Sequence, residues 1–310
     1  MKIIIDGNNL CHIVNHKTGH LSDDDRPTGV VFGFMIKLLN MCRVMKTNEF
    51  IFCWDSQKSL RKLIYPEYKS NRNNKPPVNP AEKLIGAFRG ETKEEIIARL
   101  TMEKEAERSA LFNQISELRS EIIPALGFKN NFIKTGYEAD DLIAYIVLMN
   151  PAKEFTIVST DHDLYQLLSN NVRIYNTVKK TFYTKQDFEA EFNLSPVMFR
   201  EVKAISGCTS DFIKGIQGVG DSTAAKYVRG DKISPNLLDR IKEGVDVIAR
   251  NRRLTYLPFL KEEQRGAIPK MGMPLRKDEL QLSNFKRLFN QLSFVSLLKD
   301  ISSWEQGFKL

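Results

Sequence analysis

Cysteine and histidine are both scarce in this sequence, with four residues of each among 310. The cysteines are scattered without a CxxC pair, which argues against a disulfide framework and indicates reduced thiols in a reducing compartment. The histidines at positions 12, 16 and 20 have the spacing of one helix face, but the polar run around Gly19 predicts a loop there. A zinc site, which takes most of its ligands from these two residue types, is therefore disfavoured.

Long hydrophobic runs are absent as well. No segment approaches the roughly 18 consecutive apolar residues that a membrane-spanning helix needs, and the apolar run after Met1 is too short for a secretory signal. Hydrophobic residues make up 42% and charged residues 27% of the chain, as in an ordinary globular protein. We therefore expect a soluble, cytoplasmic protein with no membrane partner, long enough for one large domain or two smaller ones.

What the sequence has in excess is positive charge. Lysine and arginine number 46 against 38 aspartate and glutamate residues, which gives a net charge of +8 and a pI of about 9.2. Such a balance suggests a polyanionic partner, most commonly nucleic acid. The excess is concentrated in residues 58–75, where six basic residues and two tyrosines accompany a single acid. This stretch predicts phosphate contacts beside stacked bases, although a solvated basic loop has the same composition.

Three short β-branched or aromatic runs end in an aspartate, at Asp6, Asp55 and Asp161. Runs of this length with helical patterns between them predict buried strands of a mainly parallel sheet flanked by helices, which is an α/β fold. Ligands of such sheets bind beyond the carboxyl ends of the strands. The three aspartates are therefore expected to converge on one crevice.

Five further acids stand in short motifs near these strands. They are Glu138, Asp140, Asp141, Asp163 and Asp211. Single acids at helix starts are usually caps, but eight carboxylates in one crevice could not all stay ionised without bound cations. Oxygen ligands suit Mg²⁺ or Mn²⁺, and two such ions about 4 Å apart are typical of phosphodiester hydrolysis. The alternative is a set of independent caps and salt bridges.

A glycine-rich turn stands inside residues 185–260, which are otherwise expected to be all-helical. Gly218 and Gly220 let backbone N–H groups approach a phosphate, and Ser222 and Lys226 lie at the start of the helix that follows. This pattern predicts a helix-hairpin-helix that binds the backbone of duplex nucleic acid without reading its bases.

Together these motifs resemble the 5′-nuclease superfamily, which comprises flap endonucleases, phage 5′–3′ exonucleases and the 5′-nuclease domain of bacterial DNA polymerase I. The resemblance runs in order along nearly the whole chain, through residues 5–8, 54–61, 66–72, 136–141, 159–164, 210–220 and 288–298. With no polymerase domain attached, a stand-alone, phage-like member is expected.

The resemblance implies a site with two divalent ions, Mg²⁺ or Mn²⁺. Asp6, Asp55, Glu138 and Asp140 would hold the first ion, and Asp141, Asp161, Asp163 and Asp211 would hold the second or lie close behind it. Lys69 and Arg72 match a catalytic basic pair that contacts the scissile phosphate, and Tyr68 would stack on a terminal base. The glycine hairpin would bind the DNA duplex and, through backbone carbonyls, K⁺.

It also implies a division of the chain and a set of partners. Residues 1–184 would form the α/β nuclease core, with a helical arch at about 73–125 that admits a 5′ single strand. Residues 185–310 would form a helical duplex-binding lobe, with the hairpin at about 203–230 and C-terminal helices packing back on the core. The expected activity is metal-dependent 5′–3′ exonuclease and flap endonuclease action on DNA in replication or repair.

The expected substrates are 5′ flaps, nicks and ends, with RNA primers in RNA–DNA hybrids as a further class. The expected partners are a single-strand-binding protein or a polymerase. The protein is expected to work as a monomer in the cytoplasm of a bacterial cell or a phage-infected host.

Two departures from the family pattern matter. The third acidic motif usually reads Gly-Asp-x-Ser-Asp-Asn, but here Cys208 replaces its first Asp and Phe212 its Asn. Cys208 is either a thiolate ligand or, as the sequence favours, a small buried apolar residue, because nothing near it in the chain lowers its pKa. About 30 residues near 78–109 also look inserted, which enlarges the arch.

Two rival functions stay open at this point. The loss of an acidic ligand at Cys208 suggests a catalytically weakened or inactive member that only binds DNA structures. The other rival is a ribonuclease of the related PIN type, although such domains are usually shorter and lack both the arch and the hairpin.

Overall fold

The computed structural model describes residues 1–73, 79–260 and 271–309, and its centre is a six-stranded sheet. The strand order is β5-β4-β1-β6-β7-β8, and every neighbouring pair is parallel except β7 with β8. The strands are β1 (Lys2–Asp6), β4 (Phe50–Trp54), β5 (Asn131–Ile133), β6 (Phe155–Val158), β7 (Val172–Asn176) and β8 (Thr181–Tyr183). The predicted α/β class with a mainly parallel sheet is confirmed.

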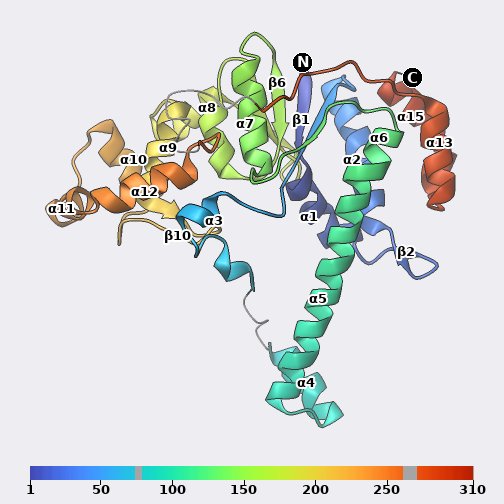
Figure 1. Cartoon of the computed structure of the whole chain (residues 1–310), viewed down its shortest axis with the longest axis horizontal. Helices are drawn as coiled ribbons and strands as arrows, with labels where there is room; N and C mark the ends of the chain where they lie inside the picture. The colour runs from blue at the N-terminus through green and yellow to red at the C-terminus, as the bar shows by residue number, and fades with distance from the viewer. Residues whose placement is uncertain (74–78, 261–270, 310) are drawn as a thin grey trace.

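Helices cover both faces of this sheet, so its central strands are buried on both sides and carry continuous apolar runs (Figure 1). Because side chains alternate along a strand, Ile3 and Ile5 pack in one hydrophobic cluster and Ile4 packs in the other. The first face carries α1 (Gly7–Thr18), α2 (Gly29–Met45) and the C-terminal helices α13 (Leu282–Gln291), α14 (Val295–Lys299) and α15 (Ile301–Phe308). The second face carries α7 (Ala139–Met149).

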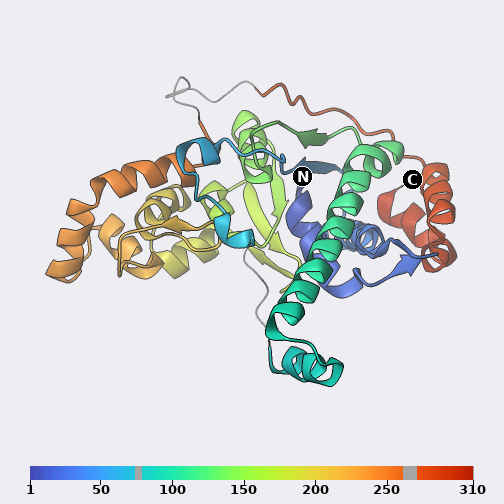
Figure 2. The same ribbon diagram turned by 60° about the horizontal axis from the view of Figure 1, so that its bottom comes forward.

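An arm projects from the body of the molecule (Figures 1 and 2). It consists of α4 (Pro80–Arg89) and α5 (Lys93–Glu117), and α5 continues through a π-helical turn, η2 (Leu118–Ile122), into α6 (Ile123–Ala125). Thr92 and Glu95 form a capping box that fixes the start of α5. The Arg99 side chain joins the two helices, because it contacts Glu82 and Glu91 at 3.1 Å. The chain approaches the arm through α3 (Arg61–Ile64) and η1 (Ser70–Asn73).

The helical lobe follows β8. Its elements are α8 (Lys185–Phe192), η4 (Pro196–Met198), α9 (Phe199–Ser206), α10 (Asp221–Arg229), α11 (Pro235–Glu243) and α12 (Val245–Thr255). The expectation that this region is all-helical is wrong at one place, where β9 (Gly207–Cys208) and β10 (Ile213–Lys214) form an antiparallel ribbon. Gly207 makes the ribbon possible, because its φ is +79° and a Cβ there would lie 2.3 Å from the Ile213 carbonyl oxygen.

The remaining short elements are β2 (Ser22–Asp23) and β3 (Arg26–Pro27), which form a hairpin between α1 and α2, and η3 (His162–Leu167), which follows β6. Within the described ranges, no helix combines the length and the apolar character needed to cross a membrane.

Candidate active site

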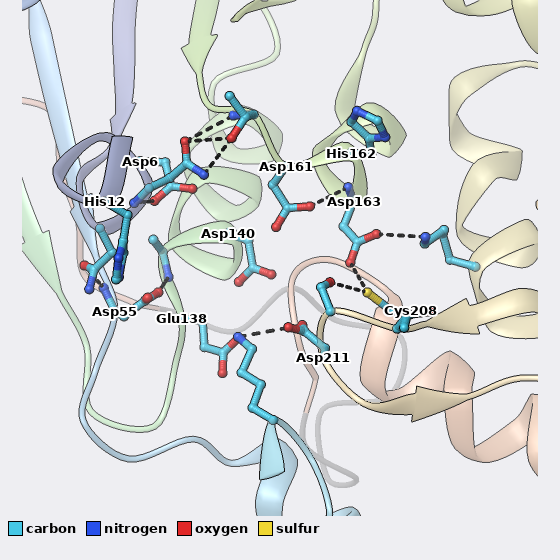
Figure 3. Close-up of a pocket in the computed structure, with 18 residues that line it drawn as sticks. Asp6, His12, Asp55, Glu138, Asp140, Asp161, His162, Asp163, Cys208 and Asp211 are labelled. Carbon is cyan, nitrogen blue, oxygen red and sulfur yellow. Dashed lines mark hydrogen bonds and ion pairs between the residues drawn. The ribbon is translucent and has the colours of Figure 1, made fainter. Parts of the chain in front are cut away.

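A cavity of about 550 Å³ lies beyond the carboxyl ends of β1, β4 and β6 (Figure 3). Seven carboxylates from five separate stretches of the chain line it: Asp6, Asp55, Glu138, Asp140, Asp161, Asp163 and Asp211. Two lysines, Lys69 and Lys203, also line it. The parallel strands therefore bring together acids that are more than 200 positions apart in the sequence.

Asp6 and Asp55 are fixed by the backbone at the ends of their strands. Asp6 caps α1 by accepting a hydrogen bond from the Asn9 N–H at 3.1 Å, and it accepts a second one from the Ser159 hydroxyl at 3.0 Å. Asp55 accepts from the Ala139 N–H at 2.9 Å, at the start of α7. Both carboxylates are thus held before any ligand arrives.

Glu138 caps α7 and is the most strongly paired acid of the cavity. Its Oε2 accepts from the Lys69 Nζ at 2.7 Å and from the Tyr68 hydroxyl at 2.8 Å. Burial opposes the charged form, but Arg61 and Lys69 outweigh it and lower the pKa of Glu138 to about 2. Glu138 therefore stays ionised throughout the physiological range.

The far side of the cavity is formed by η3 and the β9–β10 ribbon. Asp161 caps η3 by accepting from the Asp163 N–H at 2.9 Å. Asp163 lies 3.5 Å from Lys203 Nζ, and its Oδ2 accepts from Cys208 Sγ at 3.7 Å. Asp211, in the turn of the ribbon, accepts from the Tyr68 hydroxyl at 3.0 Å. Cys208 itself lines the cavity.

Four of these acids resist ionisation in the metal-free protein. Burial, and then the negative charge of Asp55, raise the pKa of Asp6 to about 7. Burial and the charge of Asp163 raise the pKa of Asp161 to about 6. Burial is also the largest cause that raises the pKa values of Asp140 and Asp163. The site therefore concentrates more negative charge than its two lysines offset, and added cations would relieve it.

Asp141 does not line this cavity, so the structure does not support a direct metal contact for it and leaves the alternative that it lies behind the site. Its side chain is fully buried, and it accepts two hydrogen bonds from Arg61 at 2.7 and 2.8 Å. Its oxygens also accept from the N–H groups of Glu138 and Phe259. Glu138 and Asp141 form a capping box, and their spacing of three residues was a sequence signal for this structural role.

Tyr68 is buried in this structure, and its expected stacking on a terminal base stays a prediction. Its side chain is only 1% exposed and packs in a small cluster with Leu254 and Ile213, so no base could lie on its ring without rearrangement. Its hydroxyl instead holds Glu138 and Asp211 together.

Of the predicted basic pair, Lys69 lines the cavity, whereas the side chain of Arg72 is not among those described. Lys69 has a left-handed backbone with φ +58°, and its Nζ lies in the cavity between Glu138 and Asp211, 3.7 Å from the latter. Arg72 belongs to η1, but its side chain lies outside the described residues.

The predicted duplex-binding hairpin stands apart from the cavity. Gly218, Gly220, Ser222 and Lys226 are all exposed, in the turn before α10 and in its first two turns. Gly218 has φ +80°, a conformation that favours glycine. The DNA-binding role of these residues and the K⁺ site stay predictions.

Lys203 is a charged lining residue that the sequence reasoning missed. Lys203 is 9% exposed, and its Nζ lies between Asp163 and Asp221, at 3.5 and 3.7 Å. A lysine inside the apolar stretch from Val202 to Ile205 was the available signal.

The disfavoured histidine site is not formed among the residues that the structure describes, where Asp163, Cys208 and Asp211 are the group positioned to share a metal ion.

Substitutions at the adjacent acids Asp140 and Asp141 should separate structure from chemistry. Asp141→Ala removes the bidentate partner of the buried Arg61 and the acceptor of the Glu138 and Phe259 N–H groups, so we expect the free energy of unfolding to fall by about 3–5 kcal/mol. Asp140→Ala removes an acid with a raised pKa and should change it by no more than about 1 kcal/mol. Urea denaturation in EDTA measures both, and equal losses would contradict the assignment.

The acids should also make stability depend on pH. A folded-state pKa raised above its unfolded value gives stability that is complete below the unfolded pKa and is lost as the pH rises through the folded pKa. With Asp6 at about 7 and Asp161 at about 6, the metal-free protein should lose about 2–4 kcal/mol of unfolding free energy between pH 5 and 8. Urea denaturation in EDTA at each pH tests this, and D6N/D161N should flatten the profile. Stability that rises with pH would refute it.

Comparison with known proteins agrees with this geometry. A family model described as "5'-3' exonuclease, N-terminal resolvase-like domain" matches residues 1–193. A 5′-3′ exonuclease of Bacillus subtilis is 28% identical over 244 residues, which cover 77% of this chain and 70% of that protein. A 5′-3′ exonuclease of Buchnera aphidicola is 24% identical over 289 residues, or 89% of each chain.

Among solved structures, the bacteriophage T5 flap endonuclease in a pseudo-enzyme–product complex with DNA and metal ions shares the fold. Its TM-score is 0.62 at 20% identity, and the match covers 97% of each chain. Because the family model spans well over half of the residues, we conclude that this chain belongs to the 5′–3′ exonuclease family, whose members are nucleases acting on DNA.

Proposed function

We propose that this protein hydrolyses DNA phosphodiester bonds near 5′ ends in a divalent-metal-dependent reaction, as a 5′–3′ exonuclease and flap endonuclease. The observation that carries the proposal is the cavity lined by seven carboxylates. An anionic substrate could not approach so much negative charge unless cations were bound between them. The T5 relative, in complex with DNA and metal ions, supports the same reading.

The donor set fits such ions. Backbone donors at strand and helix ends orient Asp6, Asp55 and Asp161. The oxygens of all seven acids are the ligands that Mg²⁺ and Mn²⁺ prefer. Asp6, Asp55, Glu138 and Asp140 would hold one ion, and Asp161, Asp163 and Asp211 would hold or orient the second. Bound there, the ions would polarise the scissile phosphate and lower the pKa of an attacking water.

Lys69 supplies the positive charge that the chain itself brings to the phosphate. Lys69 directly precedes η1, and its ammonium group lies at the cavity wall, with Nζ 2.7 Å from Glu138 Oε2. Burial opposes its charge, but Glu138 and Asp211 raise its pKa, so it stays protonated. If the Lys69 ammonium group left these acids and contacted a phosphate oxygen, it would stabilise the negative charge that develops in the transition state.

A second cavity leads the substrate to this point. It measures about 430 Å³, adjoins α5 of the arm, and shares Asp55, Lys69 and Glu138 with the acidic cavity. Its other side carries Arg108, whose guanidinium lies 5.5 Å from the centre of the Phe112 ring. Cations beside an exposed aromatic ring suit a single strand, through phosphate contacts and base stacking. The exposed hairpin before α10 would hold the duplex.

The same proposal includes the wider role. We infer activity on flaps, nicks and RNA–DNA primers in replication or repair, in the cytoplasm, alongside a polymerase or a single-strand-binding protein. The rival of a DNA-binding protein without catalysis remains, because Cys208 stands where the family has an acid. PIN-type ribonucleases usually lack both an arch and such a hairpin, so the arm formed by α4 and α5 and the hairpin before α10 argue against that rival.

A 5′-labelled DNA flap, tested separately with Mg²⁺ and Mn²⁺, should be cleaved. D161N should lower kcat by at least about 100-fold, because it removes one negative ligand oxygen, yet keep flap affinity in Ca²⁺. D25N, at an exposed acid between β2 and β3, serves as the matched control and should cleave normally. Product lengths would separate flap cutting from stepwise exonuclease action.

Binding without cleavage in either metal would instead favour the non-catalytic rival. Preferential cleavage of single-stranded RNA would favour the ribonuclease.

A further inference from the structure

Cys208 differs from the other three cysteines of the chain in its surroundings. Cys11, Cys42 and Cys53 are buried in the two hydrophobic clusters and do not line the acidic cavity. The Cys208 thiol lines that cavity, where its Sγ lies 3.7 Å from Asp163 Oδ2 and 3.0 Å from Ser210 Oγ. Cys208 is itself buried in the small hydrophobic cluster that contains Ile213 and Leu254, as the sequence favoured, but its thiol also lines the cavity beside the acids.

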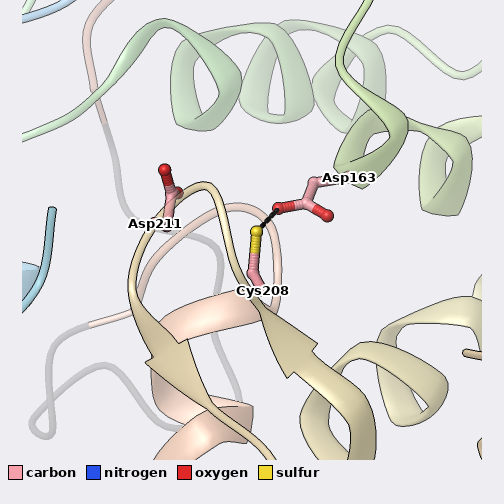
Figure 4. Close-up of side chains that lie close together, drawn as sticks. All are labelled: Asp163, Cys208 and Asp211. Carbon is pink, nitrogen blue, oxygen red and sulfur yellow. Dashed lines mark hydrogen bonds between the residues drawn. The ribbon is translucent and has the colours of Figure 1, made fainter. Parts of the chain in front are cut away.

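The thiol forms a compact ligand set with two acids (Figure 4). One ligand atom each from Asp163, Cys208 and Asp211 lies within 4.8 Å of the other two. Two parts of the fold provide them, since Asp163 lies in η3, whereas Cys208 ends β9 and Asp211 lies in the turn between β9 and β10. Three donors from two elements are a common basis for a metal site with positions left for water or substrate.

The backbone holds this set in place. Cys208 pairs with Ile213 across the ribbon. The Asp211 carbonyl accepts from the Lys69 N–H at 2.9 Å, so the turn is tied to the segment that leads to the arm. The ligand atoms are thus positioned by secondary structure rather than by flexible loops alone, which reduces the cost of binding.

Sulfur changes which ion such a set prefers. A thiolate is a soft ligand that suits Zn²⁺, Co²⁺ or Cd²⁺, whereas carboxylates alone suit Mg²⁺ and Mn²⁺. A thiolate also restores the negative charge that an aspartate would have carried at this position. Lys203 and Lys69 lie at 3.5 and 3.7 Å from Asp163 and Asp211, so two cations already partly offset the acids. A metal ion that binds here has to displace the thiol proton.

We propose that Asp163, Cys208 and Asp211 form a mixed thiolate–carboxylate site for a thiophilic divalent cation of the Zn²⁺ class. The inference rests on the proposed function, because it takes the acidic cavity to be a metal site. It gives the two halves of the cavity different preferences: the half at Asp6, Asp55 and Glu138 takes a hard ion, and the half at Cys208 takes a soft one.

Co²⁺ titration of the full chain, with a thiol-free reductant, tests the proposal directly. The complex should show the near-ultraviolet charge-transfer absorption of a thiolate–Co²⁺ bond. C208S, which keeps the size of the side chain, should lose this band, and C42S should keep it, because Cys42 lies in the hydrophobic core away from the cavity. In calorimetry, C208D should bind Zn²⁺ about 10-fold or more weakly than the unaltered chain does.

The outcomes separate this inference from the proposed function. A missing band, or a band that survives in C208S, overturns the thiolate site, whatever the flap assay shows. A band that depends on Cys208 supports the site even if no flap is cleaved with any metal, a result that would refute only the nuclease activity. Unchanged Zn²⁺ affinity in C208D would also overturn the proposal.

Discussion

Arg61 and Asp141 form a buried, bidentate ion pair, and three parts of the chain are tied together through it. Arg61 begins α3 and also donates to the Leu254 carbonyl at 2.8 Å, at the end of α12 in the helical lobe. Asp141 lies in the first turn of α7 and accepts from the Phe259 N–H at 2.7 Å. The core helix, the approach to the arm and the lobe therefore share one contact, whose disruption would remove the bidentate partner of a buried charge.

This contact also sets the electrostatics of the neighbouring acids. Arg61 lies 3.7 Å from Glu138 and 3.8 Å from Asp140, so one buried cation acts on the first half of the cavity. It helps keep Glu138 ionised, but burial and the charge of Asp141 still raise the pKa of Asp140. Asp6 and Asp161 also have raised pKa values. Clustering these acids therefore lowers the free energy of unfolding of the protein, as is common at functional sites.

The sequence was sufficient for β1, β4 and β6, because buried strands of a parallel sheet carry continuous apolar runs and each of these three runs is followed by or ends at an aspartate. It did not indicate β5, β7 and β8, which complete the six-stranded sheet. It also led to seven of the eight predicted carboxylates in one cavity, since strand ends meet at one edge. It did not show the contacts of Asp141 with Arg61 or of Tyr68 with Leu254, because these partners are distant in the chain and no local pattern reveals them. The β9–β10 ribbon escaped for the same reason, because two-residue strands have no periodicity to detect.

Crystals soaked in Mn²⁺ and measured for anomalous scattering would test most directly whether the acidic cavity is a divalent-metal centre. The account predicts an anomalous peak among Asp6, Asp55, Glu138 and Asp140, with Lys69 displaced from its contact with Glu138. Mn²⁺ bound only outside the cavity, or a cavity that stays without a peak at saturating Mn²⁺, would contradict it.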